Sequence, residues 1–164
     1  MLLVAIDGLR IVTLGDEPQN RIADEMNALS PDDRALTQAA MEFIRTRYIE
    51  NRHHIGAAIR GGSGRIYLGL HLDTYVGRCS VCAEAVALGS ALSAGETVID
   101  SVVSVRHPRP RERHAQPKVV SPCGICREML TDFAPGAGII MSRAGGLRRI
   151  AVAELLPDKY RREL

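Results

Sequence analysis

Four cysteines are the residues best suited to chemistry, and they form two Cys-x-x-Cys pairs: Cys79 with Cys82, and Cys123 with Cys126. In a chain without a secretion signal, this spacing indicates a metal or redox site before a disulfide framework. Cys123 and Cys126 stand three residues apart at a predicted helix start, so both can reach one ion. A third thiolate from Cys82 would leave the fourth tetrahedral position of a zinc ion for water, which is the arrangement of a catalytic zinc site.

Glu84 stands two residues after Cys82, near enough to act on such a water without binding the metal. Three thiolates leave surplus negative charge on the zinc, which makes a bound water a weaker acid than it is among neutral imidazoles. We expect the positive ends of two helices to offset part of this charge. Arg127, beside Cys126, can add a full positive charge. Glu84 could then carry a proton from water to a leaving group, which predicts zinc-assisted hydrolysis.

The competing interpretation is a structural zinc site, because four thiolates would close the coordination sphere and stop catalysis. Zinc ribbons separate their cysteine pairs by about 15 to 20 residues, whereas residues 83–122 separate the two pairs here. A ribbon also leaves Glu84 and Pro122, which opens the second helix, without a role. The sequence therefore favours the catalytic site, with Cys79 as a spare thiol in the loop before the first helix.

The elements that must position these residues follow from periodicity and turn signals. Helices are predicted from Cys82 to Ala94 and from Cys123 to Phe133, and an earlier helix has Ser30 as its N-cap and Pro31 at its first position. Strands are predicted over 55–59, 65–72, 98–105, 137–141 and 147–152, with a glycine-rich turn at 61–64 and a charged tail over 153–164. The continuous apolar run 98–105 suits the middle of a sheet. This order predicts an α/β sandwich with a mixed sheet.

The N-terminus is predicted to be a separate hairpin, in which Leu2–Ile6 and Leu9–Leu14 are joined by Asp7-Gly8. We therefore divide the chain into an N-terminal hairpin extension, residues 1–30, and a catalytic domain, residues 31–164. No basic region precedes the first apolar run, so no signal peptide is expected.

Composition limits the classes of function. The chain has 164 residues, 46% of them hydrophobic, and a formal net charge of +2, which suits one globular domain without a global electrostatic partner. The longest uncharged stretch, 85–95, is too short for a bilayer span of about 18 to 20 residues. A protein that binds single-stranded nucleic acid needs aromatic side chains on which bases stack. This chain has four Tyr, two Phe and no Trp, and the proline-rich basic loop 106–118 is by itself weak evidence for nucleic-acid binding. We expect a cytoplasmic protein without nucleic-acid or membrane partners.

The two zinc motifs, Cys82-Ala83-Glu84 and Pro122-Cys-x-x-Cys, together resemble those of the cytidine deaminase-like zinc nucleoside deaminases, in their three-cysteine branch. The Ile-Gly-Ala-Ala run at 55–58 and Leu-Leu-Pro at 155–157 are also similar, so the resemblance covers about residues 35–160.

This resemblance implies a three-layer α/β/α fold and a zinc ion held by Cys82, Cys123 and Cys126. It assigns the catalytic proton shuttle to Glu84. It also implies that the backbones of Ala83 and Ser121 flank the amino-bearing edge of the substrate ring. The same resemblance implies a homotetramer, the usual assembly of family members of this size.

The departures from the family concern the substrate. Cytidine deaminases hold the ribose with an Asn-x-Glu element, and the matching residues here are His71 and Asp73. Ala85 replaces an arginine that often follows Cys-Ala-Glu, and His53 replaces an aromatic residue of the base pocket. These changes are closer to blasticidin S deaminases than to ordinary cytidine deaminases. For His71, the sequence supports substrate contact and core packing equally. The other histidines are interpreted as surface or packing residues.

The sequence thus predicts a zinc-dependent hydrolytic deaminase that releases ammonia from a small aminopyrimidine nucleoside or a nucleoside-like compound. The alternative is a catalytically silent deaminase-fold protein that binds a ligand and keeps a structural zinc site. Glu84 argues against that alternative, because a silent protein has no need of a proton shuttle.

Overall fold

The computed structural model describes residues 25–112, 116–144 and 146–162. The predicted hairpin at 2–14 lies outside these residues. One mixed sheet of six strands forms the centre, and its main path runs β2-β1-β3-β5-β6. The strands are β1 (Ile55–Gly61), β2 (Ile66–Leu70), β3 (Ile99–Arg106), β4 (Lys118–Val120), β5 (Gly138–Arg143) and β6 (Gly146–Ala151).

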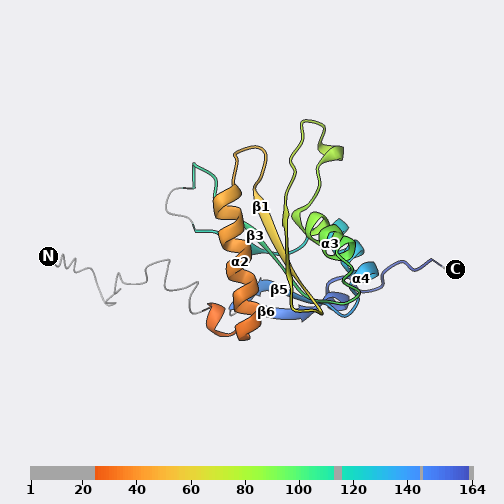
Figure 1. The fold of residues 1–164 in the computed structure, drawn as a ribbon. Helices are drawn as coiled ribbons and strands as arrows, with labels where there is room; N and C mark the ends of the chain where they lie inside the picture. Colours follow the sequence, from red (N-terminus) through yellow and green to blue (C-terminus); the bar gives the residue numbers. More distant parts are fainter. Residues whose placement is uncertain (1–24, 113–115, 145, 163–164) are drawn as a thin grey trace, which may run out of the picture.

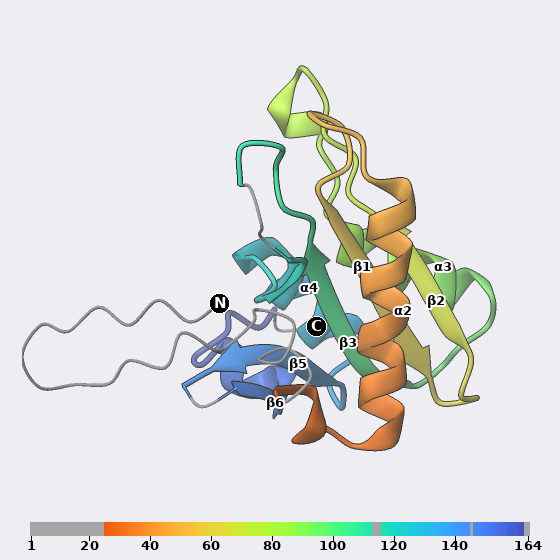
Figure 2. The same cartoon turned by 90° about the vertical axis from the view of Figure 1, so that its left-hand side faces the viewer.

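Three helices cover the two faces of the sheet and make a three-layer α/β/α sandwich (Figures 1 and 2). Helix α2 (Pro31–Arg47) lies on one face, and α3 (Ala83–Ser93) and α4 (Gly124–Phe133) lie on the other. Among the described strand pairs, β3–β5 is parallel and the others are antiparallel. Strands β5 and β4 pair with the same side of β3, β5 with its first half and β4 with its second half. The predicted fold class is therefore confirmed, including the central place of the apolar strand β3.

Two hydrophobic cores fill the spaces between the layers. Because side chains alternate along a strand, Ala57 and Ile59 of β1 pack toward α3 and α4, and Ala58 packs toward α2. Helix α2 contributes Leu36 and Ile44 to the second core, and both are fully buried. Ser30 caps this helix as predicted, since its hydroxyl accepts a hydrogen bond from the backbone N–H of Asp33 at 3.1 Å.

Gly69 lets α3 approach the sheet closely. A Cβ atom on Gly69 of β2 would lie 2.1 Å from the carbonyl oxygen of Ala83 and 2.4 Å from the backbone nitrogen of Ala87. Only glycine fits at this contact. The start of α3, where Cys82 and Glu84 stand, is therefore fixed directly against β2.

A charged network ties strands β1, β3 and β6 to α2. Asp100 of β3 accepts hydrogen bonds from Arg60 of β1 at 2.6 Å and from Arg149 of β6 at 2.8 Å, and both arginines also pair with the buried Asp33. Hydrogen bonds from Arg149, and next from Arg60, lower the pKa of Asp100 from 3.8 to about 2.

This network makes acid stability dependent on Asp100. A carboxyl whose pKa is lowered by folding contributes stability above its unfolded pKa, and that contribution is lost as pH falls toward the folded pKa. We expect the free energy of unfolding to fall by about 1 kcal/mol between pH 4 and pH 2 because of Asp100. The effect is small because the Asp100 side chain is 39% exposed and water screens its ion pairs. Urea unfolding of Asp100→Asn should lack this part of the pH dependence, and an unchanged profile would contradict it.

Two parts of the fold differ from the sequence prediction. The chain end is not only a charged tail, because η2 (Val152–Leu155) is a 3₁₀ turn whose Val152 and Leu155 are buried in the first core. The described residues of the basic loop also make regular contacts: Lys118 belongs to β4 and pairs with Arg106 of β3, which forms an ion pair with Glu112. Across the described residues, no helix is both long and apolar enough to cross a bilayer.

Candidate metal centre and active site

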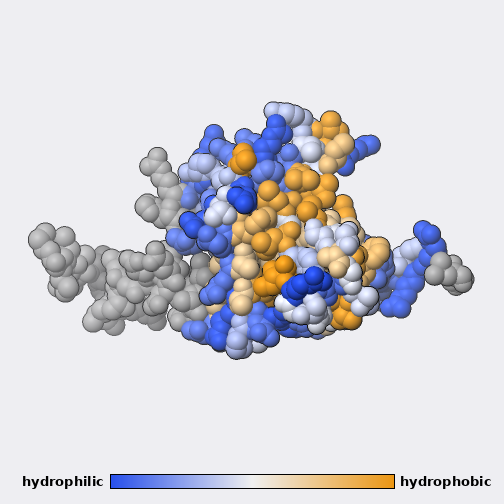
Figure 3. Space-filling model, viewed as in Figure 1, coloured by the Kyte–Doolittle hydropathy of each residue, from blue (hydrophilic) through white to orange (hydrophobic). Residues whose placement is uncertain are grey.

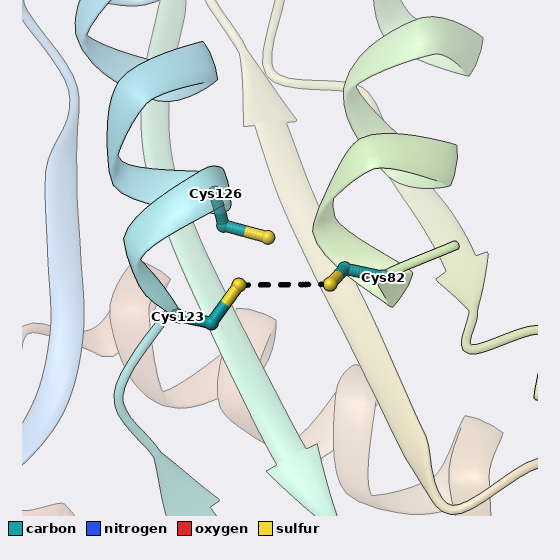
Figure 4. Close-up of side chains that lie close together, drawn as sticks. All are labelled: Cys82, Cys123 and Cys126. Carbon is teal, nitrogen blue, oxygen red and sulfur yellow. Dashed lines mark hydrogen bonds between the residues drawn. The ribbon is translucent and has the colours of Figure 1, made fainter. Parts of the chain in front are cut away.

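The three cysteines of the predicted zinc site meet where α3 and α4 begin. Cys82 is the N-cap residue of α3 and Cys123 is the N-cap residue of α4, so each thiol stands at the positive end of a helix. Cys126 follows on the first turn of α4 and is fully buried. Figure 4 shows the three sulfur atoms pointing toward one another from these two helices.

The sulfur geometry fits a tetrahedral metal ion. All three Sγ atoms lie within 4.8 Å of one another, and those of Cys82 and Cys123 are 3.6 Å apart. In a tetrahedral zinc site with Zn–S bonds of about 2.3 Å, neighbouring sulfurs are about 3.8 Å apart. A disulfide would need about 2.05 Å, and all the cysteines are free. The arrangement therefore suits shared binding of one ion.

The pKa values of the three thiols are shifted in different directions by their surroundings. Burial, followed by the charge of Glu84, raises the pKa of the Cys126 thiol, and burial also raises the pKa of Cys82. Burial acts in the same direction on Cys123, but hydrogen bonds from the backbone N–H and thiol of Cys126, the thiol of Cys82 and the backbone N–H of Ile125 together outweigh it and lower the pKa of that thiol. The N-terminus of α4 thus stabilises a thiolate, as expected at a helix start.

Glu84 lies in the first turn of α3 and is only 5% exposed. Its charge acts on the thiols of both Cys82 and Cys126, so the carboxylate lies beside the sulfur cluster. A buried carboxylate next to three thiols is costly unless a cation is present. Glu84 and the cysteines therefore fit a site that holds a metal ion.

Cys79 is outside this cluster. It ends the 3₁₀ turn η1 (Gly77–Cys79) and is exposed, and among the described residues the group that could hold a metal consists of the other three cysteines. A fourth position therefore remains free of a protein thiol in this arrangement. This bears on the main alternative, since a structural site of four thiolates would need Cys79 within the cluster.

His71 and Asp73, which match the ribose-binding Asn-x-Glu element of cytidine deaminases, lie next to the candidate metal site. An antiparallel bridge joins Leu72 to Val81, with both backbone hydrogen bonds at 3.0 Å. Antiparallel register therefore sets His71 opposite Cys82 and Asp73 opposite Ser80. The Ser80 hydroxyl donates to Asp73 at 3.4 Å, in agreement with that register. Nδ1 of His71 is buried, and no atom of the described residues serves as its hydrogen-bond partner.

The other two predicted substrate residues also lie at the helix starts. Ala83 is the first residue of α3 and is 1% exposed, which leaves its backbone as the group at the site. Ser121 is exposed two residues before Cys123, and its hydroxyl accepts a hydrogen bond from Arg127 at 2.9 Å. All of the predicted site residues thus come from the two helix starts and the strand connection that faces them.

A cluster of rings behind His71 was missed by sequence reasoning. Tyr48 stacks on His107 with 4.1 Å between ring centres and meets His54 edge-on at 5.9 Å. His54 reaches toward Asp73, 3.7 Å from Nε2 to the carboxylate. These residues are half-buried, so His54 and His107 are packing residues, which is one of the two roles expected for them. No motif in the sequence joins these residues, because His107 is far from Tyr48 and His54 along the chain.

Comparison with known proteins identifies the family. Residues 30–142 match the cytidine and deoxycytidylate deaminase zinc-binding region, which is more than half of the chain. The chain belongs to this family of zinc deaminases.

Individual relatives agree with this assignment. The chain is 44% identical to blasticidin-S deaminase of Bacillus cereus over 134 residues, which cover 82% of this chain and 96% of that protein. It is 28% identical to a cytidine deaminase of Sporosarcina psychrophila over 111 residues, 66% of this chain and 76% of the relative. The structure of cytidine deaminase from Burkholderia pseudomallei has the same fold, with a TM-score of 0.63 and 24% identity over 80% of this chain and all of that one. The protein is a zinc-dependent hydrolytic deaminase.

Proposed function

We propose that this deaminase acts on blasticidin S or a closely similar aminopyrimidine nucleoside compound, with Cys82, Cys123 and Cys126 holding zinc and Glu84 moving the proton. The observation that carries the assignment is the convergence of three thiols from two helix N-termini beside a buried carboxylate.

Each residue has a defined task in this reaction. Zinc, when bound, supplies a Lewis acid that makes water a stronger nucleophile near neutral pH. Glu84 takes the proton from the attacking water and gives it first to the ring nitrogen and then to the departing amine. A carbon–oxygen bond forms, the exocyclic carbon–nitrogen bond breaks, and ammonia leaves. The backbones of Ala83 and Ser121 orient the amino-bearing edge of the ring.

The substrate class rests on two observations. The identity to blasticidin-S deaminase, 44%, is well above the 28% identity to a cytidine deaminase. His71 and Asp73 stand opposite Cys82 and Ser80, where cytidine deaminases carry the Asn-x-Glu element that holds the ribose. The polar groups available to the sugar side of the substrate therefore differ from those of cytidine deaminases. Zinc-loaded protein should release ammonia from blasticidin S faster than from cytidine. Ammonia release from cytidine alone, or from neither compound, would contradict the proposal.

Restoring the Asn-x-Glu element should shift the preference toward cytidine. We expect the double variant His71→Asn, Asp73→Glu to raise kcat/KM for cytidine about tenfold, because one added hydrogen bond contributes about 1 kcal/mol or somewhat more. Its kcat/KM for blasticidin S should fall in the same preparation, which controls for general damage. No gain on cytidine would show that these two positions do not meet the sugar.

A homotetramer is proposed as the assembly. Apolar side chains gather over β2 and α3 in Figure 3, and several on β2 and the following connection are exposed: Ile66, Leu68, Leu72, Tyr75, Val76 and Val81. An exposed apolar face of this kind fits contact with other copies of the chain. Light scattering should give about four times the 17.8 kDa chain mass, and a monomer would contradict the assembly.

Two further predictions concern the chain as a whole. We propose that the catalytic domain begins near residue 31, because the family region begins at residue 30. Limited proteolysis should spare the domain from that point, and cleavage inside α2 would contradict this boundary. A cytoplasmic location is proposed because the four cysteines are free thiols, and thiols stay reduced in the cytosol. Secretion of the native protein would contradict it.

A further inference from the structure

The segment that leads into Cys123 has little support from the sheet. The ladder between β3 and β4 ends at the pair Ser104–Val120, and three residues then run from Ser121 to Cys123. The middle residue of these three, Pro122, has no backbone N–H to donate. Another part of the molecule must hold this segment if Cys123 is to stay in line with Cys82.

Arg127 supplies that support. Its Nε donates to the carbonyl oxygen of Pro122 at 3.0 Å, and its Nη2 donates to the hydroxyl of Ser121 at 2.9 Å. Its Nη1 donates to the carbonyl oxygen of Leu155 at 3.2 Å. One guanidinium group thus joins the segment before α4, α4 itself and η2.

The contact with Leu155 connects the segment to the core. The Leu155 side chain is 6% exposed and Val152, at the start of the same turn, is fully buried in the core beneath α3 and α4. The planar guanidinium can direct three N–H groups at fixed angles, whereas a lysine ammonium cannot reproduce that fork. The three hydrogen bonds of Arg127 go to these oxygens, which adds a structural task to the charge-offsetting role expected from the sequence.

We propose that Arg127 is a positioning residue that holds Cys123 and the backbone of Ser121 in register with the start of α3. This inference rests on the proposed function in one respect only, the assignment of Cys123 as a metal ligand. It predicts that the geometry of the guanidinium matters, and that its charge alone does not suffice.

The test compares Arg127→Lys, which keeps the charge, with Arg127→Gln, which removes it. The rate of zinc release to a chromogenic chelator and the KM and kcat for blasticidin S are measured for both. We expect both variants to release zinc about tenfold faster than the original protein, the lower end of the effect of residues that support metal ligands. Arg148→Lys, an exposed arginine on β6, is the matched control and should release zinc at the original rate.

The outcomes separate the two roles of Arg127. If Arg127→Lys behaves like the original protein, the positioning role is overturned, whatever the result for Arg127→Gln. Ser121→Ala removes one of the three hydrogen bonds, so it should speed zinc release about two- to threefold, and this milder variant decides the matter if the Arg127 variants fail to fold. If the original protein holds zinc but releases no ammonia, the proposed function fails, while faster zinc release from Arg127→Lys still supports the positioning role.

Discussion

Glu84→Gln is expected to abolish ammonia release while the protein keeps its zinc. Glutamine has nearly the same shape as glutamate, but its amide cannot accept and return a proton at neutral pH. General acid–base catalysis contributes about 10²- to 10⁴-fold to a rate, so kcat should fall by at least that factor. Glu84 is 5% exposed beside the sulfur cluster, and little water is available there to replace it.

The measurement pairs ammonia release with zinc content in one sample. Glu154→Gln is the matched control, since Glu154 is an exposed glutamate in η2, and this variant should retain full turnover. Zinc content should be the same in all three proteins. Ammonia release by zinc-loaded Glu84→Gln within a few-fold of the original rate would remove Glu84 from the reaction.

Cys126→Ser is expected to remove both zinc and activity. Cys126 is fully buried in the first turn of α4, and loss of one of three thiolate ligands leaves two, which is too few for a stable protein site. After dialysis against a chelator, we expect zinc to fall from about one ion per chain to nearly none. Turnover should fall with it.

Cys79→Ser provides the comparison, because it makes the same chemical change on an exposed thiol outside the cluster. This variant should keep its zinc and its turnover. If Cys79→Ser loses zinc while Glu84→Gln remains active, the site is structural and the catalytic assignment fails. Metal analysis by mass spectrometry decides between the two results.

Local sequence signals were sufficient to select the three cysteines that lie together. Cys123 and Cys126 are close in the sequence and on one helical turn, and Glu84 is two residues from Cys82, so spacing alone placed each set correctly. N-caps, turns and apolar periodicity also depend on neighbouring residues. For this reason the helices and the five longer strands agree with the sequence prediction to within a few residues.

The features that were missed depend on contacts between distant residues. β4 has only three residues, and it becomes a strand because Val120 pairs with Ser104 of β3. Leu155 joins the core through a 3₁₀ turn that no periodicity could reveal. The contact of Tyr48 with His107 brings together the residue that follows α2 and the residue that follows β3. A single sequence carries no signal for pairings of this kind until the topology is known.

X-ray absorption spectroscopy at the zinc edge of the zinc-loaded protein tests the account most directly, because it counts the sulfur atoms bound to the metal. We expect three sulfur ligands at about 2.3 Å and one lighter atom, oxygen or nitrogen, at about 2.0 to 2.2 Å. Addition of a nucleoside should change the lighter shell and leave the sulfur shell intact. Four sulfur ligands would close the position that hydrolysis needs, and would contradict the assignment of this centre as catalytic.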